Sequence, residues 1–181
     1  MKHTIALIPG DGIGPEVISA AVSVLNAACP GQFEYEEVFA GGCAIDKFGV
    51  PLPDASLNTC KSSAAVLLGA VGGPQWNDLP ARLRPEQALL GLRAGLGLFA
   101  NLRPAKTFPA LADSSPLRRD AAERGFDLLI VRELTGGIYF GEKGCRGEGR
   151  EAAAYDIEIY SVPEIERIGR RAFEAALARR K

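Results

Sequence analysis

A glycine-rich segment near the N-terminus is the first part of the sequence whose residue types could bind a ligand. Residues 10–16, GDGIGPE, lie between an apolar run that predicts a strand and a helix start favoured by Pro15. Glycines let a ligand approach the backbone, and the free N–H groups of a helix N-terminus favour an anionic or polar group. The spacing is G-x-G-x-G, which differs from the G-x-G-x-x-G fingerprint of dinucleotide-binding folds. A tight strand-to-helix turn without a ligand is the alternative interpretation.

Three arginines form a second candidate site. Arg93 and Arg103 flank the Gly-rich end of a predicted helix, and Arg132 directly follows an apolar run that ends at Val131. Arginines at the ends of secondary-structure elements could converge on a carboxylate substrate through bidentate pairs. Three solvated or salt-bridged side chains are the alternative that the sequence leaves open.

A tyrosine is the third candidate. Tyr139 follows the Gly136-Gly137 turn and lies seven residues after Arg132. A phenol near guanidinium groups can have a lowered pKa and act as an acid or base, although a tyrosine packed in a strand is the simpler interpretation. His3 is the only histidine. This chain therefore excludes Ser–His and Cys–His catalysis and a His-rich metal site.

The elements that must position these residues alternate between strands and helices in the first part of the chain. Apolar runs predict buried strands, and helical spacing of apolar residues predicts helices between them. The strands are expected at 3–8, 33–39 and 64–70, and the helices at 15–29 and 54–61. Alternation of this kind, with strands apolar on both faces, indicates an α/β sheet that is at least partly parallel.

The second part of the chain predicts a different arrangement. A helix is expected over 85–98, although Gly91, Gly95 and Gly97 weaken it, and a buried strand over 126–131. Alternating apolar and polar residues at 138–142 and 155–160 predict a hairpin with a long tip at 143–151. The last segment, 163–180, predicts an amphipathic helix. Its expected inward residues are Ile165, Ile168, Ala172, Phe173, Ala176 and Leu177.

Composition narrows the class of protein. The 181 residues are 47% hydrophobic and 24% charged, which is typical of a globular core. A net charge of −1 gives no reason to expect nucleic acid or an anionic membrane surface as a partner. No apolar run reaches the roughly 18 residues of a membrane span. The four cysteines, Cys29, Cys43, Cys60 and Cys145, lack CxxC spacing and are expected to be reduced thiols in the cytoplasm.

Several long motifs occur in order and carry a family resemblance over essentially the whole chain. They are IPGDGIGPEV (8–17), GAVGGP (69–74), RPEQALLGLR (84–93), LFANLRPAK (98–106) and VRELTGGIYFGE (131–142). Together they resemble the isocitrate/isopropylmalate dehydrogenase family of β-decarboxylating dehydrogenases. The resemblance implies the α/β fold of that family, with a β-hairpin arm in the second domain at about Ile138 to Tyr160. It also implies a first domain at 1–99, holding the cofactor and substrate, and a second domain for dimerisation at 100–181.

The resemblance implies a reaction and its cofactors. The family oxidises a 2-hydroxy diacid with NAD, and the resulting β-keto acid loses carbon dioxide. For this sequence the implied reaction is decarboxylation of 3-isopropylmalate to 2-oxoisocaproate in leucine biosynthesis, by a cytoplasmic homodimer. A divalent cation, Mg²⁺ or Mn²⁺, holds the hydroxyl oxygen as a Lewis acid, and its ligands are expected beyond residue 181.

Individual residues take roles from the same resemblance. Arg93, Arg103 and Arg132 match the arginines that hold the malate carboxylates, and Tyr139 matches the tyrosine that protonates the enolate carbon. The nicotinamide side of the cofactor is lined by Ile13, Gly72 and Gly73. Glu86 matches the acidic residue between substrate and nicotinamide ribose.

Substrate choice follows from the predicted helix at 85–98. Isocitrate-specific relatives place polar Ser and Asn where this chain has Gln87 and Leu89. Leu89 and Leu90 suit an isopropyl group and would leave a third carboxylate unpaired, which is costly once it is desolvated. Tartrate and other alkylmalates remain alternatives.

The end of the sequence raises a rival hypothesis. The family's catalytic lysine, metal-binding aspartates and adenosine-binding segment are expected after Lys181, so the chain resembles an N-terminal half. On that expectation the 181-residue chain alone is inactive. A non-catalytic truncated protein shares every motif and differs only in the residues expected after position 181.

Overall fold

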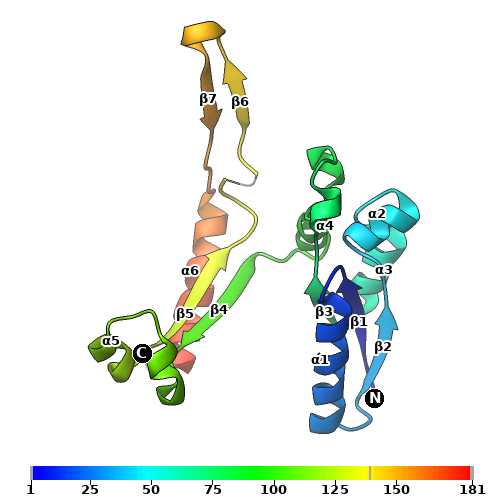
Figure 1. Ribbon diagram of the computed structural model, residues 1–181, viewed down its shortest axis with the longest axis vertical. Helices are drawn as coiled ribbons and strands as arrows, with labels where there is room; N and C mark the ends of the chain where they lie inside the picture. The colour runs from blue at the N-terminus through cyan, green and yellow to red at the C-terminus, as the bar shows by residue number, and fades with distance from the viewer. Residues whose placement is uncertain (1, 139, 180–181) are drawn as a thin grey trace. The chain divides into compact units, whose positions relative to one another are not determined.

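Two compact units make up the chain. The computed structural model describes residues 2–138 and 140–179, and the chain divides into Met1–Leu98 and Phe99–Lys181 (Figure 1). Each unit has its own sheet and helices. The functional roles expected of the two domains stay predictions.

A three-stranded parallel sheet forms the centre of the first unit. β1 (His3–Gly10) lies in the middle, in the order β2-β1-β3. In the register of the sheet, Ile5 lies between Tyr35 of β2 and Ala65 of β3. The remaining strands and the helices of this unit are β2 (Phe33–Glu37), β3 (Ala65–Ala70), α1 (Gly14–Ala28), α2 (Gly42–Phe48), α3 (Asp54–Ser62) and α4 (Gln87–Gly95), with 3-10 turns at Pro74–Trp76 and Ala81–Leu83.

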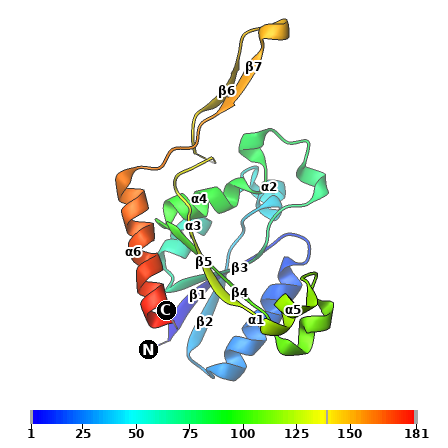
Figure 2. The ribbon, with the colours of Figure 1, turned by 90° about the vertical axis from the view of Figure 1, so that its left-hand side faces the viewer.

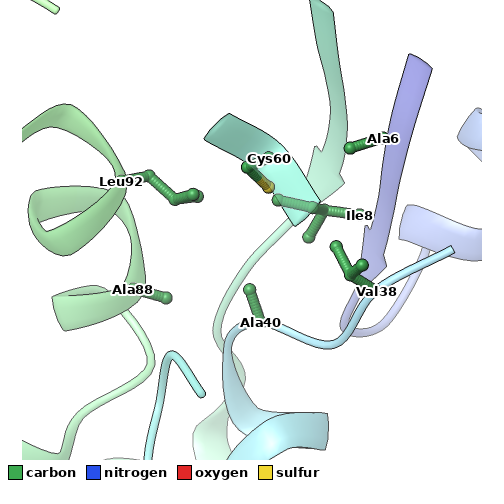
Figure 3. Packing of buried hydrophobic residues seen from close by; sticks show 7 residues of the cluster. All are labelled: Ala6, Ile8, Val38, Ala40, Cys60, Ala88 and Leu92. Carbon is green, nitrogen blue, oxygen red and sulfur yellow. The ribbon is translucent and has the colours of Figure 1, made fainter. Parts of the chain in front are cut away.

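The sheet buries a separate core on each face because successive side chains of a strand point to opposite sides. Ile5 and Leu7 of β1 pack with Ile18 of α1 on one face. On the other face, Ala6 and Ile8 lie in a cluster with residues of the loop after β2, of α3 and of α4 (Figure 3). Helices therefore cover both faces, which is the arrangement expected of a parallel sheet.

The second unit is built on an antiparallel strand pair. β4 (Ala100–Lys106) pairs with β5 (Asp127–Glu133), and α6 (Val162–Ala178) runs along one face of the pair. Leu129 and Val131 of β5 line an open groove with Ala172 and Ala175 of α6. The alternate residues on β5 face away from the helix. This unit also contains α5 (Arg119–Arg124), β6 (Lys143–Arg146), β7 (Ala153–Asp156) and 3-10 turns at Pro109–Ser114 and Gly149–Glu151.

The predicted inward face of the last helix is partly wrong. Ile165, Phe173 and Leu177 are 57%, 76% and 69% exposed, so these side chains lie on the outer side of α6. Ala172 and Ala176, which were predicted to face inwards, do line the groove beside β5, together with Ala175. Hydrophobic periodicity located the helix. However, α6 carries apolar residues on more than one face, and the pattern could not show which face packs against β5.

The hairpin lies closer to the tip of the arm than predicted. Alternation favoured strands at 138–142 and 155–160, whereas the paired strands are β6 and β7, in the register Lys143↔Asp156. Gly137 accepts backbone hydrogen bonds from the N–H groups of Phe140 and Gly141, so the chain turns where a strand was predicted. Gly147 and Gly149 have positive φ angles of 74° and 58° and close the tip. Figure 2 shows the hairpin extending away from α6 and from the β4–β5 pair.

Most other sequence predictions of secondary structure are confirmed. The α/β class, the parallel sheet, α1, α3, α4 and β5 are all present, and the four cysteines are free thiols. Three elements were missed, namely α2, β4 and α5. β4 contains Pro104, which argues against a central strand, and it is accommodated in a two-stranded pair. None of the helices within the described residues is long and apolar enough to cross a membrane.

The loop after β1 provides a stability test with a matched control. A Cβ at Gly14 would lie 1.9 Å from the carbonyl oxygen of Pro9, whereas a Cβ at Gly12, with φ +55°, would meet nothing within 4 Å. We expect Gly14→Ala to destabilise the first unit by about 3 kcal/mol or more, and Gly12→Ala by only about 1 kcal/mol of backbone strain. Urea unfolding can be followed by the fluorescence of Trp76, the single tryptophan. Equal shifts of the two midpoints would show that close packing at Gly14 is unimportant.

Candidate functional site

The loops that follow β1 and β3 meet at the carboxyl ends of these neighbouring strands. Gly10 pairs with Ala70 in the sheet, and a Cβ at Gly10 would lie 1.9 Å from the oxygen of Ala70. Gly10 and Gly14 of the GDGIG loop are thus needed for close packing of backbones, as in a tight turn. Ile13, at the N-cap of α1, is 62% exposed. Ligands of open α/β sheets bind at this edge, outside the carboxyl ends of the strands.

Asp11 joins this loop to two other segments. Its side chain is 4% exposed, and its Oδ2 accepts hydrogen bonds from the N–H of Gly42 at 2.8 Å and of Gly72 at 2.7 Å. Its Oδ1 accepts a bond from the N–H of Cys43 at 2.7 Å. The backbone N–H of Asp11 donates to the oxygen of Ala70 at 2.7 Å. One carboxylate therefore ties together the loop after β1, the start of α2 and the loop after β3.

The loop after β3 brings two of the predicted cofactor residues close together. Gly72 has a φ of +106°, and a Cβ at this position would lie 3.4 Å from Oε1 of Glu86. Gly73 packs against the ring of Trp76, which is 7% exposed and donates its indole N–H to Asp46 at 3.0 Å. Side chains at these glycines would fill the space beside Glu86 and Trp76. Because residue 72 is a glycine, no side chain covers its backbone at this edge of the sheet.

Helix α4 and its N-cap residue Glu86 carry the other predicted residues of the first unit on one side. At about 100° per residue, Glu86, Leu90 and Arg93 fall within a narrow arc that Leu89 extends. The opposite side holds Ala88 and Leu92, which are buried in the core (Figure 3). Arg93, Leu89 and Leu90 are half-buried and Glu86 is exposed. α4 can therefore present a carboxylate, an apolar surface and a guanidinium group along one stripe.

The two arginines of the second unit share a face of the β4–β5 pair. Arg132 is the partner of Asn101 in the register and Arg103 is the partner of Ile130. Because residues two apart on a strand lie on one face, Arg103 and Arg132 are on the same side of the pair. This is the side away from α6. The Nε–H of Arg103 donates to Oδ1 of Asn101 at 3.0 Å.

A polar cluster fixes the chain directly after Arg132. The side chain of Glu133 is 6% exposed, and its Oε1 accepts bonds from the hydroxyl of Thr135 at 2.6 Å and from Nη2 of Arg167 at 2.8 Å. Burial raises the pKa of Glu133, but the hydrogen bonds from Thr135 and Arg167 outweigh it and leave the pKa below its ordinary value. Arg167 also lies 5.0 Å from the centre of the Phe99 ring. The cluster holds α6 to the end of β5.

Not every predicted site residue can be placed. Tyr139 lies outside the described residues. Arg93 belongs to the first unit, and Arg103 and Arg132 belong to the second, so the convergence of all three on one carboxylate substrate stays a prediction. Within residues 2–138 and 140–179, no group of three or more His, Cys, Asp or Glu residues could hold a metal ion.

Sequence reasoning missed the structural role of Asp11. The GDGIG loop drew attention to its glycines and to the amides of a helix N-terminus, and the aspartate between them received no role. The available signal was an acidic residue that closely follows the apolar run at 5–8, where the side chain must be buried or turn outwards. Cys43 donates its N–H to Asp11, and burial and then the charge of Asp11 raise the pKa of its thiol.

Comparison with known proteins assigns the chain to a family. The family model described as isocitrate/isopropylmalate dehydrogenase matches residues 4–181. The chain belongs to the isocitrate/isopropylmalate dehydrogenase family. A 3-isopropylmalate dehydrogenase of Clostridium acetobutylicum is 56% identical over 99% of this chain and 51% of the relative, and one of Halalkalibacterium halodurans is 53% identical over 100% and 51%. The chain thus spans about half the length of the curated relatives it matches.

Solved structures of this family agree in fold. An isocitrate dehydrogenase from Methylococcus capsulatus superposes with a TM-score of 0.76 at 35% identity, covering 97% of this chain and 48% of that one. A β-decarboxylating dehydrogenase from Thermococcus kodakarensis gives a TM-score of 0.70, also at 35% identity, over 97% and 46%. The family fold predicted from the sequence motifs is therefore confirmed.

Proposed function

We propose that this chain supplies the substrate-holding and nicotinamide-facing part of an NAD-dependent β-decarboxylating dehydrogenase that oxidises 3-isopropylmalate. The observation that carries the proposal is the stripe of Glu86, Leu89, Leu90 and Arg93 on α4, with Glu86 next to Gly72. The curated relatives named above are 3-isopropylmalate dehydrogenases, which supports the same substrate. Cytoplasmic localisation, a homodimeric state and a place in leucine biosynthesis belong to this proposal.

The residues of the first unit suit the nicotinamide side of the cofactor. Ile13 is exposed beside the loop that Asp11 anchors, and Gly72 leaves room for close approach to the backbone. NAD, when bound, accepts a hydride from the carbon that carries the substrate hydroxyl. Glu86 would lie between the substrate and the nicotinamide ribose.

The arginines and the tyrosine would act on the substrate itself. Arg93, Arg103 and Arg132 present planar guanidinium groups, which bind carboxylates through two parallel hydrogen bonds. Oxidation of the 2-hydroxyl gives a β-keto acid, which loses its neighbouring carboxylate as carbon dioxide. The carbon that carried that carboxylate then takes up a proton, and we assign the donor to Tyr139. The overall products are 2-oxoisocaproate, carbon dioxide and NADH.

A divalent cation belongs to the proposal only where metal ligands from outside the described residues are also present. The described residues of this chain do not make a metal site by themselves. Mg²⁺ or Mn²⁺ would need carboxylates from outside residues 2–138 and 140–179, and no step of the reaction is assigned to the cation.

A chimera tests the function and the substrate together. The 181 residues are joined to the remaining half of the Clostridium acetobutylicum relative, and NADH formation is measured with 3-isopropylmalate, isocitrate and tartrate. Because Leu89 and Leu90 would leave a third carboxylate unpaired, we expect kcat/KM for isocitrate to be at least about 10²-fold lower than for 3-isopropylmalate.

The unmodified relative and its isolated second half serve as the controls of this experiment. The first must be active and the second inactive under the same conditions. A folded chimera that oxidises isocitrate or tartrate better than 3-isopropylmalate would overturn the substrate assignment. One that oxidises none of the three acids would overturn the function.

A further inference from the structure

The burial of Asp11 calls for an explanation beyond packing. A buried carboxylate is expensive unless hydrogen bonds compensate for its lost hydration. Three backbone N–H groups do so here, from Gly42, Cys43 and Gly72, all at 2.7–2.8 Å. A hydrophobic side chain in its place would leave these three amides buried without an acceptor. The charged group is therefore suited to holding backbone segments in a defined position.

Two of the three segments that Asp11 joins carry residues proposed to line the cofactor. Ile13 follows two residues later on the same loop, and the N–H of Gly72 binds Asp11 directly. Glu86 lies beside Gly72. A displacement of the Asp11 carboxylate would move the loop after β3 relative to the loop after β1. Helix α4, which carries the residues proposed to face the substrate, is held instead through the core, where Ala88 and Leu92 are buried.

We propose that Asp11 is the positioning residue for the nicotinamide side of the cofactor, an inference that rests on the proposed function. Its carboxylate holds the loop after β1 and the loop after β3 at a fixed spacing, through Gly72 and the start of α2. The cofactor is proposed to contact both loops, so its binding depends directly on the distance between them. The substrate is held by arginines elsewhere and is affected much less.

Asp11→Asn is a sharp test because it preserves the shape of the side chain. The asparagine oxygen can still accept the hydrogen bonds made to one of the two carboxylate oxygens. Its NH₂ group, in the place of the other oxygen, would face at least one of the three N–H donors. One amide is then left buried without an acceptor. In the chimera described above, we expect the KM for NAD to rise at least about tenfold. The KM for 3-isopropylmalate and kcat at saturating NAD should stay within about threefold.

Asp46→Asn is the matched control. Asp46 lies on α2, the helix whose start binds Asp11, and accepts a hydrogen bond from the indole of Trp76 at 3.0 Å. An asparagine oxygen can still accept that bond. We expect no change in the KM for NAD beyond about twofold. A merely structural role for Asp11 would lower the thermal midpoint of Asp11→Asn without separating the two KM values.

A second pair of variants keeps Asp11 itself, in case Asp11→Asn fails to fold. Cys43→Pro removes the single N–H that binds Oδ1 of Asp11 and puts a ring carbon in place of its hydrogen, so the carboxylate must move. The position lies in the first turn of a helix, where proline is tolerated. Cys43→Ala keeps that N–H and removes only the thiol. We expect a rise in the KM for NAD of about threefold or more for Cys43→Pro, and no rise for Cys43→Ala.

The outcomes separate this inference from the proposed function. Loss of activity in the chimera with the unaltered chain would refute the function. An active chimera in which Asp11→Asn and Cys43→Pro leave the KM for NAD unchanged would refute the role of Asp11 alone. Parallel increases in the KM values for NAD and 3-isopropylmalate would also contradict it, because they indicate a general loss of structure.

Discussion

Purified on its own, the 181-residue chain is expected to give no detectable 3-isopropylmalate-dependent reduction of NAD. The family resemblance places a catalytic lysine and metal-binding aspartates outside these residues, and the described residues contain no cluster that could hold a metal ion. Loss of a general base reduces rates typically by about 10²–10⁴-fold, and loss of a Lewis-acid cation adds several kcal/mol to the barrier. We therefore expect at least about 10⁴-fold less turnover than in the chimera.

The measurement is the appearance of NADH with added Mg²⁺, using protein from a host that lacks its own enzyme. Addition of the separately purified second half of the Clostridium acetobutylicum relative is the complementary experiment. Turnover that scales with the concentration of the isolated chain, and that Arg132→Ala removes, would disprove the expectation. It would mean that the residues of this chain contain a sufficient set of catalytic groups.

The second large effect is expected from the tyrosine. In the chimera, Tyr139→Phe should lower kcat by about 10²–10⁴-fold, because the ring is kept while the proton donor is lost. The KM for 3-isopropylmalate should change by less than about threefold. Intermediate that has lost carbon dioxide but lacks its proton should build up or be released, which rapid quenching of the reaction can detect.

Two further variants separate this role from substrate binding and from packing. Arg132→Lys should raise the KM for 3-isopropylmalate at least about tenfold, since a point charge cannot replace a bidentate fork. Tyr160→Phe removes only a hydroxyl that donates to Glu158 at 3.2 Å, so kcat should change by less than about threefold. Equal effects of Tyr139→Phe and Arg132→Lys on substrate KM would show that the tyrosine is misassigned.

The sequence predicted the first unit well because its signals are local. Apolar runs on β1 and β3 and the helical spacing of α1 depend on neighbouring residues, and each was found close to its observed bounds. The glycines of α4 were interpreted as weaknesses of the helix. In the structure a Cβ at Gly91 would lie 2.9 Å from Leu52 and one at Gly95 2.7 Å from Leu57. Their absence of side chains permits the packing of α4, which only the tertiary contacts reveal.

The parts that could not be predicted depend on distant residues. Asp11 acts through amides at positions 42, 43 and 72, and no local pattern connects these positions. Alternation misplaced the hairpin strands because the turn at Gly137 interrupts the arm before the strands pair. The common face of Arg103 and Arg132 can be recognised only from the register of β4 with β5. β4 was not predicted, because it contains Pro104. For the candidate site, the motifs identified the residues and the structure supplied their arrangement within each unit.

The bonds of Asp11 also link distant parts of the first unit during folding. Its partners lie 31, 32 and 61 positions away, so all three bonds close long loops, which are slow to form. Enclosing the carboxylate before its donors arrive would leave a buried, unpaired charge. We therefore expect the carboxylate to lose its hydration only together with the arrival of its three donors. On this expectation the loops after β1 and β3 and the start of α2 become ordered as one unit.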